Sequence, residues 1–150
     1  MEKKHIIVLT AVLALSFLAG LADGTRDVLS FRYSRSIFPQ GDGETLLGAG
    51  AQFWNPDISW RNKWKDGDPL QGERFPLSST ALVFLTDGWH LLQFLMLTFF
   101  QLAIAMPVVM LLRLRWWWVL IAVVPLKLAF SAGFTLMFAW ALLRRRPAAA

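Results

Sequence analysis

Three long apolar blocks constrain this chain more than any other feature of its sequence. They cover residues 6–22, 81–112 and 116–143, and each is long enough to cross a membrane, or nearly so, as a helix. Hydrophobic residues fill 56% of the 150 positions and charged residues 17%, whereas soluble domains average roughly a quarter charged residues. A chain of this length builds too small a core to bury that excess. The sequence therefore predicts an all-α membrane protein and argues against a soluble globular enzyme.

The first block has two interpretations. Lys3 and Lys4 precede it and Asp23 follows it, which suits a transmembrane helix or signal anchor at the short end of the spanning range. The same layout suits a secretory signal peptide cleaved near Ala22, which would leave two transmembrane helices instead of three. Small residues also recur at every fourth position, a spacing that lets a second helix approach closely: Ser16, Gly20 and Gly24.

The second and third blocks predict a C-terminal helical hairpin. As one helix, residues 81–112 would be about 48 Å long, so the first turns should project beyond the membrane. Arg113 and Arg115 bracket a tight turn, residues 116–143 form the third helix, and residues 144–150 form a basic tail. The third helix begins with an aromatic cluster of the kind found at headgroup level: Trp116, Trp117 and Trp118.

The basic residues give conflicting indications of orientation. Lys3, Lys4 and the short turn near Arg113 lie on one side of a three-span protein, and short basic loops usually stay cytoplasmic. More arginines lie on the other side, but long polar segments cross a membrane largely regardless of charge. We therefore expect the N-terminus inside and residues 23–79 outside. A re-entrant break at Pro125, which would return the C-terminal arginines to the cytoplasm, is the alternative.

Polar residues of the last two helices fall on one face of each helix. On the third helix, Lys127, Ser131 and Thr135 follow at i, i+4 and i+8. If the hairpin turns at Leu114, Lys127 meets Gln101 and Thr135 meets Gln93. We call these five residues the polar seam. It serves either as hydrogen bonding between the two helices or as a contact surface for another molecule.

Lys127 favours the contact surface. Straight-helix geometry places it about 16 Å below Trp116, near the bilayer centre, where a lysine costs at least ~2.5 kcal/mol. We expect no carboxylate of this chain at its depth, so Lys127 is neutral, snorkelling, hydrated or paired with another molecule. The expected contacts are lipid and either other membrane-protein subunits or a second copy of the chain.

Asp87 and His90, three residues apart at the start of the second helix, are weak catalytic candidates. An aspartate can orient an imidazole as a general base or metal ligand, and capping of the helix is the other interpretation. A zinc site needs three or four ligands, and the other histidine, His5, lies at the opposite membrane face, which also excludes a bis-histidine haem within one chain. The chain has no cysteine. We expect no metal and no cofactor.

Residues 56–66 in the long loop predict a short interfacial helix. Asn55 suits the N-cap, Pro56 the first helical position and Gly67 the end. Its aromatic and basic side chains suit the headgroup region: Trp60, Trp64, Arg61 and Lys63. Nucleic-acid binding uses similar residue types, but we do not expect it in a loop attached to two membrane spans.

Residues 53–90 read FWNPDISWRNKWKDGDPLQGERFPLSSTALVFLTDGWH. They contain an SW-x-NK stretch, a GDP element, an FP-x-S turn and a TD-x-WH helix start, and the hydroxyl residues at 78–80 suit caps for the following helix. This pattern resembles that of a group of small bacterial integral membrane proteins. The resemblance implies a multi-pass protein of the bacterial inner (cytoplasmic) membrane and carries no function. It marks Trp60, Asn62, Lys63, Asp87, Trp89 and His90.

Two functions fit these features. The favoured one is a non-enzymatic accessory or assembly subunit of a larger membrane complex, contacting partner helices or lipid through the polar seam. The alternative is a small membrane enzyme or transporter-like unit that uses Asp87 and His90 at the outer membrane face for proton or metal chemistry.

Overall fold

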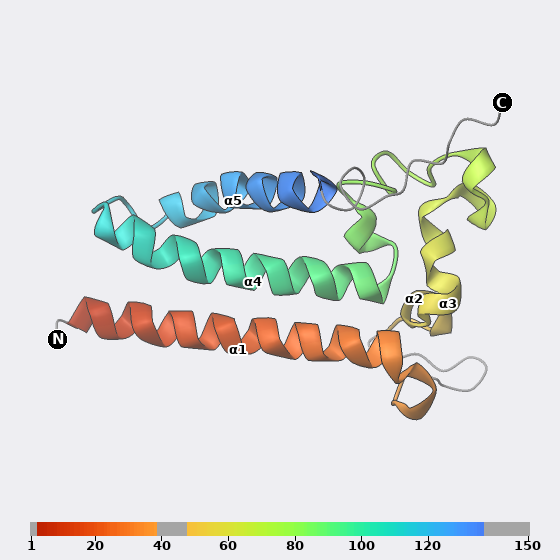
Figure 1. Cartoon of the computed structure of the whole chain (residues 1–150), viewed down its shortest axis with the longest axis horizontal. Helices are drawn as coiled ribbons and strands as arrows, with labels where there is room; N and C mark the ends of the chain where they lie inside the picture. Colours follow the sequence, from red (N-terminus) through yellow and green to blue (C-terminus); the bar gives the residue numbers. More distant parts are fainter. Residues whose placement is uncertain (1–2, 39–47, 137–150) are drawn as a thin grey trace. The chain divides into compact units, whose positions relative to one another are not determined.

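The computed structural model describes residues 3–38 and 48–136, and this part of the chain is built from helices and turns (Figure 1). Three of its helices are long and apolar enough to cross a membrane: α1 (Lys3–Phe31), α4 (Gly88–Leu111) and α5 (Trp118–Thr135). The prediction of an all-α membrane protein with three such helices is confirmed. The chain divides into two compact units, residues 13–100 and residues 1–12 with 101–150.

Helix α1 continues well past the apolar block at residues 6–22 that predicts it. Arg26 pairs with Asp23 one turn earlier, with 2.7 Å between the guanidinium nitrogen and Oδ1. Thr25 and Ser30 donate their hydroxyl protons to the backbone oxygens of Leu21 and Arg26. Because these polar side chains are satisfied within the helix, it persists to Phe31. The first part of the expected loop at residues 23–79 is therefore helical.

The rest of the loop consists of short helical turns. They are η1 (Tyr33–Arg35), α2 (Ala51–Trp54), α3 (Pro56–Ser59), η2 (Trp60–Lys63), η3 (Lys65–Gly67), η4 (Pro69–Gln71) and η5 (Val83–Leu85). Asn55 caps α3 as expected, since its Oδ1 accepts from Asp57 N at 3.0 Å. The helix predicted at residues 56–66 is one α-turn that tightens into 3-10 turns, and Asp66, with a φ of 48°, leaves helical geometry.

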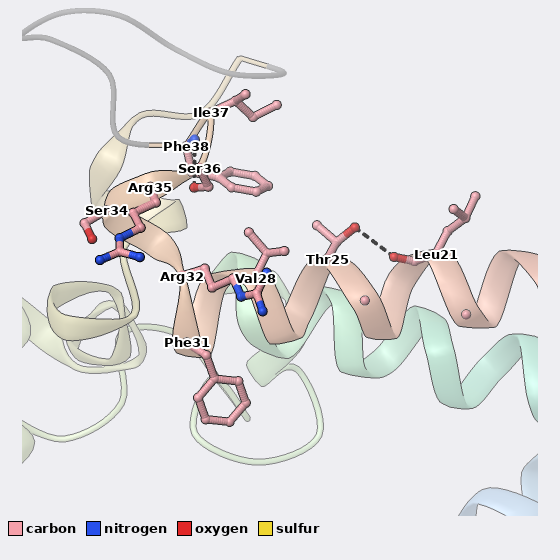
Figure 2. Close-up of a pocket in the computed structure, with 12 residues that line it drawn as sticks. Leu21, Thr25, Val28, Phe31, Arg32, Ser34, Arg35, Ser36, Ile37 and Phe38 are labelled. Atoms are coloured by element: carbon pink, nitrogen blue, oxygen red, sulfur yellow. Dashed lines mark hydrogen bonds between the residues drawn. The ribbon is translucent and has the colours of Figure 1, made fainter.

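A small aromatic core joins this loop to the ends of α1 and α4 within the unit of residues 13–100. Leu29, Phe38 and Trp54 are buried at its centre, with Trp89 and other partly buried side chains packed around them. The Phe38 and Trp54 rings lie 5.1 Å apart, and Figure 2 shows the segment that carries Phe38 doubling back above α1. The loop is therefore folded onto the helix ends, because its aromatic side chains are buried against apolar surface there.

Helix α4 begins at Gly88, later than the predicted start at residue 81. The hydroxyl residues expected to cap it act elsewhere: Ser78 Oγ donates to Lys63 O at 2.7 Å, and Ser79 bonds to Glu73. These bonds hold residues 77–80 in a turn, and the chain passes through η5 before the helix starts. Thr86 and Asp87 therefore precede the helix.

Helix α4 ends in the tight turn predicted near Arg113. Leu114 N donates to Val109 O at 3.0 Å and Arg113 N to Met110 O at 3.1 Å, while Arg113 adopts a φ of 54°. This pair of bonds around a left-handed residue is the Schellman arrangement. Helix α5 follows and is continuous through Pro125. Residues 137–143 of the predicted third helix and the tail at 144–150 lie outside the described residues.

Candidate functional site

Asp87 is the residue on which α4 begins. Its Oδ1 accepts a hydrogen bond from His90 N at 2.9 Å, and its backbone oxygen accepts from Leu91 N at 3.0 Å. These are the bonds of an N-cap, in which a side-chain oxygen satisfies one of the free N–H groups at a helix start. A carboxylate also complements the positive end of the helix dipole. The expected pairing of Asp87 with His90 is therefore a cap bonded to the third helical residue.

The His90 imidazole folds back onto the same carboxylate. Its Nδ1 lies 2.9 Å from Asp87 Oδ1 and 2.7 Å from Asp87 Oδ2. Only 2% of the Asp87 side chain is exposed, against 25% for His90. Nδ1 is bonded to the carboxylate, and no hydrogen bond joins the other ring nitrogen, Nε2, to the described part of the chain.

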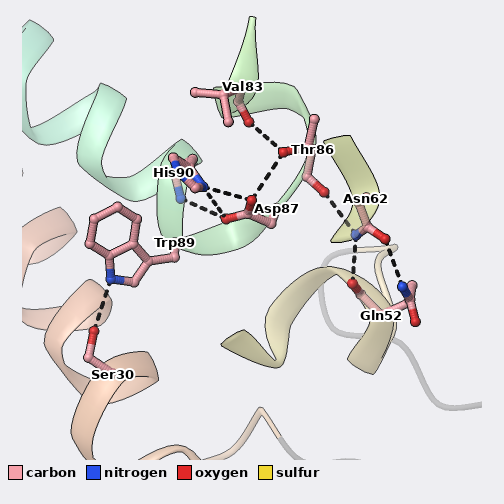
Figure 3. Close-up of polar contacts among 8 residues, drawn as sticks. All are labelled: Ser30, Gln52, Asn62, Val83, Thr86, Asp87, Trp89 and His90. Atoms are coloured by element: carbon pink, nitrogen blue, oxygen red, sulfur yellow. Dashed lines mark hydrogen bonds and ion pairs between the residues drawn. The ribbon is translucent and has the colours of Figure 1, made fainter. Parts of the chain in front are cut away.

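A second polar contact fixes the loop against this cap (Figure 3). Asn62 Nδ2 donates to Thr86 O at 3.0 Å and to Gln52 O at 2.7 Å, and Gln52 Nε2 donates back to Asn62 Oδ1 at 2.7 Å. Thr86 Oγ1 lies 2.7 Å from Val83 O and 3.0 Å from Asp87 Oδ2, and its single proton serves one of the two. The amide of Asn62 thus ties α2 and η2 to the residue before the cap.

The start of α4 also packs directly on α1 and α2. Trp89 Nε1 donates to Ser30 Oγ at 2.9 Å, and the Arg26 guanidinium lies 5.5 Å from the centre of the Trp89 ring. Gly88 is buried against Trp54 so closely that a Cβ at residue 88 would lie 2.4 Å from Trp54 Cε3. None of these three contacts can be predicted from neighbouring residues, because each joins residues more than thirty positions apart.

The Asp87 carboxylate fixes the orientation of the His90 ring. Among residues 3–38 and 48–136, no group of three or more His, Asp, Glu or Cys side chains gathers to hold a metal ion. The described contacts of Asp87 are those of a helix cap. Of the two ring nitrogens of His90, only Nε2 has no hydrogen bond to a described residue. The geometry therefore shows structural capping by Asp87, and a chemical role for His90 stays a prediction.

The polar seam is distributed over both compact units. Gln93 is half-buried in the unit of residues 13–100. In the other unit, Gln101 is buried and its Oε1 accepts no hydrogen bond from a described residue, while Ser131 and Thr135 are exposed on α5. The expected meeting of Gln101 with Lys127 across a hairpin stays a prediction.

The residues expected at the membrane interface differ in their exposure. Trp60 is exposed, Trp64 is half-buried, and each carries a cation beside its ring: Arg61 at 5.3 Å and Lys63 at 5.8 Å from the ring centres. The aromatic cluster at the start of α5 is exposed, and its second and third rings stack 4.9 Å apart: Trp116, Trp117 and Trp118. Their position at a membrane interface stays a prediction.

Glu73 is a structural residue that sequence reasoning missed. Its carboxylate accepts from Leu77 N at 2.9 Å and from Ser79 N at 3.1 Å, and the Ser79 hydroxyl donates to it as well. The hydroxyl and N–H of Ser79, and then the N–H of Leu77, hold the pKa of Glu73 below its ordinary value. The segment carries no pattern that distinguishes this glutamate from an exposed one.

Comparison with protein-family models, curated proteins and solved structures gives no match to this chain. The resemblance of residues 53–90 to small bacterial membrane proteins therefore stays a prediction.

Proposed function

We propose that this chain is a non-enzymatic accessory or assembly subunit of a complex in a bacterial inner membrane, and that α5 contacts its partner. One observation carries the proposal: a groove of about 490 Å³ on α5. Its lining combines small and hydroxyl-bearing residues with two leucines: Leu128, Ser131, Ala132, Thr135 and Leu136.

The groove has the chemistry by which membrane helices associate. Ser131 and Thr135 lie one turn apart on the same helix face, and the small side chains around them let another backbone approach closely. A hydroxyl that bonds across two membrane helices contributes about 0.6 kcal/mol, and up to 1–2 kcal/mol in favourable cases. The described residues of α5 include no buried side chain, and most of them are exposed.

Lys127 extends the same face by one turn towards the centre of the membrane. It precedes Ser131 by four residues, so the two side chains lie one above the other. An ionisable group at this depth is costly unless it meets an acidic side chain, a lipid headgroup or water. A partner helix that fills the groove would therefore also reach the level of Lys127.

The test is purification of the full tagged chain from membranes in a mild detergent. We expect a second protein, or a second copy of the chain, to co-purify in fixed ratio. Ser131→Leu with Thr135→Leu should lower its recovery about tenfold, because losing about 1.4 kcal/mol of association energy has that effect. Ala129→Leu is the matched control, since Ala129 is exposed on roughly the opposite face of α5. No partner at all, or equal recovery with both variants, would contradict the proposal.

A second function is favoured by the contact between Asp87 and His90. The carboxylate fixes Nδ1 and leaves Nε2 available, the arrangement of a histidine that exchanges protons. A small enzyme or transporter-like unit would use this atom for proton or metal chemistry at the outer membrane face. In the same purification, Asp87→Asn and His90→Ala should leave partner recovery unchanged. Loss of a turnover or of proton flux in these variants, with no partner to be found, would favour this second function.

A further inference from the structure

An open cavity lies beside the C-terminal half of α1 (Figure 2). It has a volume of about 1240 Å³ and belongs entirely to the unit of residues 13–100. One side is the helix surface from Gly20 to Val28, and the other is the segment that leads to Phe38. Arg32 and Arg35, which follow the end of the helix in the sequence, also line the cavity.

On the helix side of the cavity, no other part of the described chain covers the backbone at Gly20 and Gly24. A Cβ added at Gly20 or at Gly24 would meet no atom within 4 Å, so the backbone there is uncovered within the described structure. Gly20 lies in the apolar block of α1, and Leu21 beside it is exposed. This end of the cavity is therefore apolar and lies within a helix that is long and apolar enough to cross a membrane.

The other end of the cavity is cationic. Arg26, one turn away, is already paired with Asp23, whereas Arg32 and Arg35 are exposed and form no ion pair with a described residue. Figure 2 shows the Arg32 side chain extending back along α1 towards Val28. A guanidinium group presents two parallel N–H donors that match a phosphate group.

The helix residues that line the cavity cover the depths of both the acyl chains and the headgroup of a lipid. A ~30 Å hydrocarbon layer that begins near Ile6 ends about twenty residues later, near Thr25. Val28, the level that the Arg32 side chain reaches, lies about 5 Å further along the helix, within the headgroup layer. From Gly20 to Arg32 the helix axis covers about 18 Å, so one molecule lying here spans both layers.

We propose that this cavity binds an acidic phospholipid, with its phosphate at Arg32 and Arg35 and an acyl chain along the bare surface at Gly20 and Gly24. A soluble anion would use the arginines and leave the apolar end empty, and a neutral lipid would leave the arginines without a counter-charge. The site is independent of the α5 groove, since it lies in the other compact unit.

The test is native mass spectrometry of the full chain released from mild detergent with phosphatidylglycerol or phosphatidylcholine added. We expect selective retention of phosphatidylglycerol, and Arg32→Gln with Arg35→Gln should weaken it roughly tenfold or more, since hydrogen bonds to charged groups contribute about 1.5–3 kcal/mol. Lys65→Gln with Arg74→Gln removes the same charge from exposed positions outside the cavity and is the matched control.

Two further measurements make the proposal falsifiable. Gly20→Leu with Gly24→Leu fills the helix side of the cavity without changing the charge and should also weaken retention. Unchanged retention in that variant would overturn the placement of the acyl chain. Equal retention of both lipids, equal loss in the arginine and control variants, or full displacement of phosphatidylglycerol by inorganic phosphate would overturn the lipid site.

Discussion

Gly88 has little room for a larger side chain. It is buried where Trp54 lies across the start of α4, and the space that a Cβ would need is occupied by the Trp54 ring. Trp54 cannot move aside easily, because its ring also packs against Phe38 and Phe53. The glycine at this position is therefore required by packing and not by its backbone angles.

We expect Gly88→Ala to lower the free energy of unfolding by about 1–3 kcal/mol, the usual cost of overpacking a tight site. The higher helix propensity of alanine offsets at most about 1 kcal/mol of this. Gly133→Ala in α5, where a Cβ meets nothing within 4 Å, is the matched control and should not destabilise. Thermal unfolding in detergent measures both variants, and equal stability of the two would refute the packing argument.

Glu73 predicts how the loop responds to acid. Its pKa is lower in the folded chain than in the unfolded chain, so its stabilising effect is complete above its ordinary pKa of about 4.3. The effect is lost as the pH falls through the lowered pKa of the folded state. The turn at residues 77–79 should therefore weaken only at acidic pH.

The experiment compares Glu73→Gln with the native chain in thermal unfolding between about pH 3 and 7. The native chain should be more stable at neutral pH, and the difference should shrink as the pH falls through the lowered pKa. Asp57→Asn, an exposed carboxylate on α3, serves as the control. A difference that is constant across this range would show that ionisation of Glu73 does not stabilise the turn.

At the scale of elements, the apolar blocks located the helices but misplaced two of their ends. Hydropathy reports where the lipid-compatible segment lies, whereas a helix ends where its backbone groups find other partners. Helix α1 continues through polar residues that are satisfied locally, and α4 starts late because Asp87 supplies the cap. The N-cap at Asn55 and the turn at Arg113 were predictable, since both depend on neighbouring residues alone.

The turn after α4 allows a prediction about the stability of this helix end. Arg113 adopts a left-handed conformation that costs a residue with a side chain roughly 1 kcal/mol and costs glycine almost nothing. Arg113→Gly should therefore raise the free energy of unfolding by up to about 1 kcal/mol. Arg115→Gly, where φ is not positive, should bring no such gain. If both substitutions destabilise equally, the Schellman turn does not limit the stability of this helix end.

At the scale of the whole molecule, the two proposed binding surfaces lie in different compact units. The α5 groove belongs to the unit that contains residues 101–150, and the arginine-ended cavity belongs to residues 13–100. Substitutions at sites that share no partners have nearly additive effects. The variants of each proposal are therefore natural controls for the other, because a general loss of folding would abolish partner and lipid together.

The sequence by itself determined that this is a membrane protein with three apolar helices. It also determined which polar and ionisable residues accompany them. These follow from composition and from neighbours within one or two turns, which the order of residues specifies directly. The tertiary structure decided that Asp87 caps α4, that Asn62 and Glu73 hold the loop, and that Arg32 borders a cavity. The hydrogen bond from Asn62 to Thr86, which lies 24 positions away, depends on the path of the loop back onto the helix ends. That path is set by burial of Phe38 and Trp54 against residues far away in the chain, which no local pattern encodes.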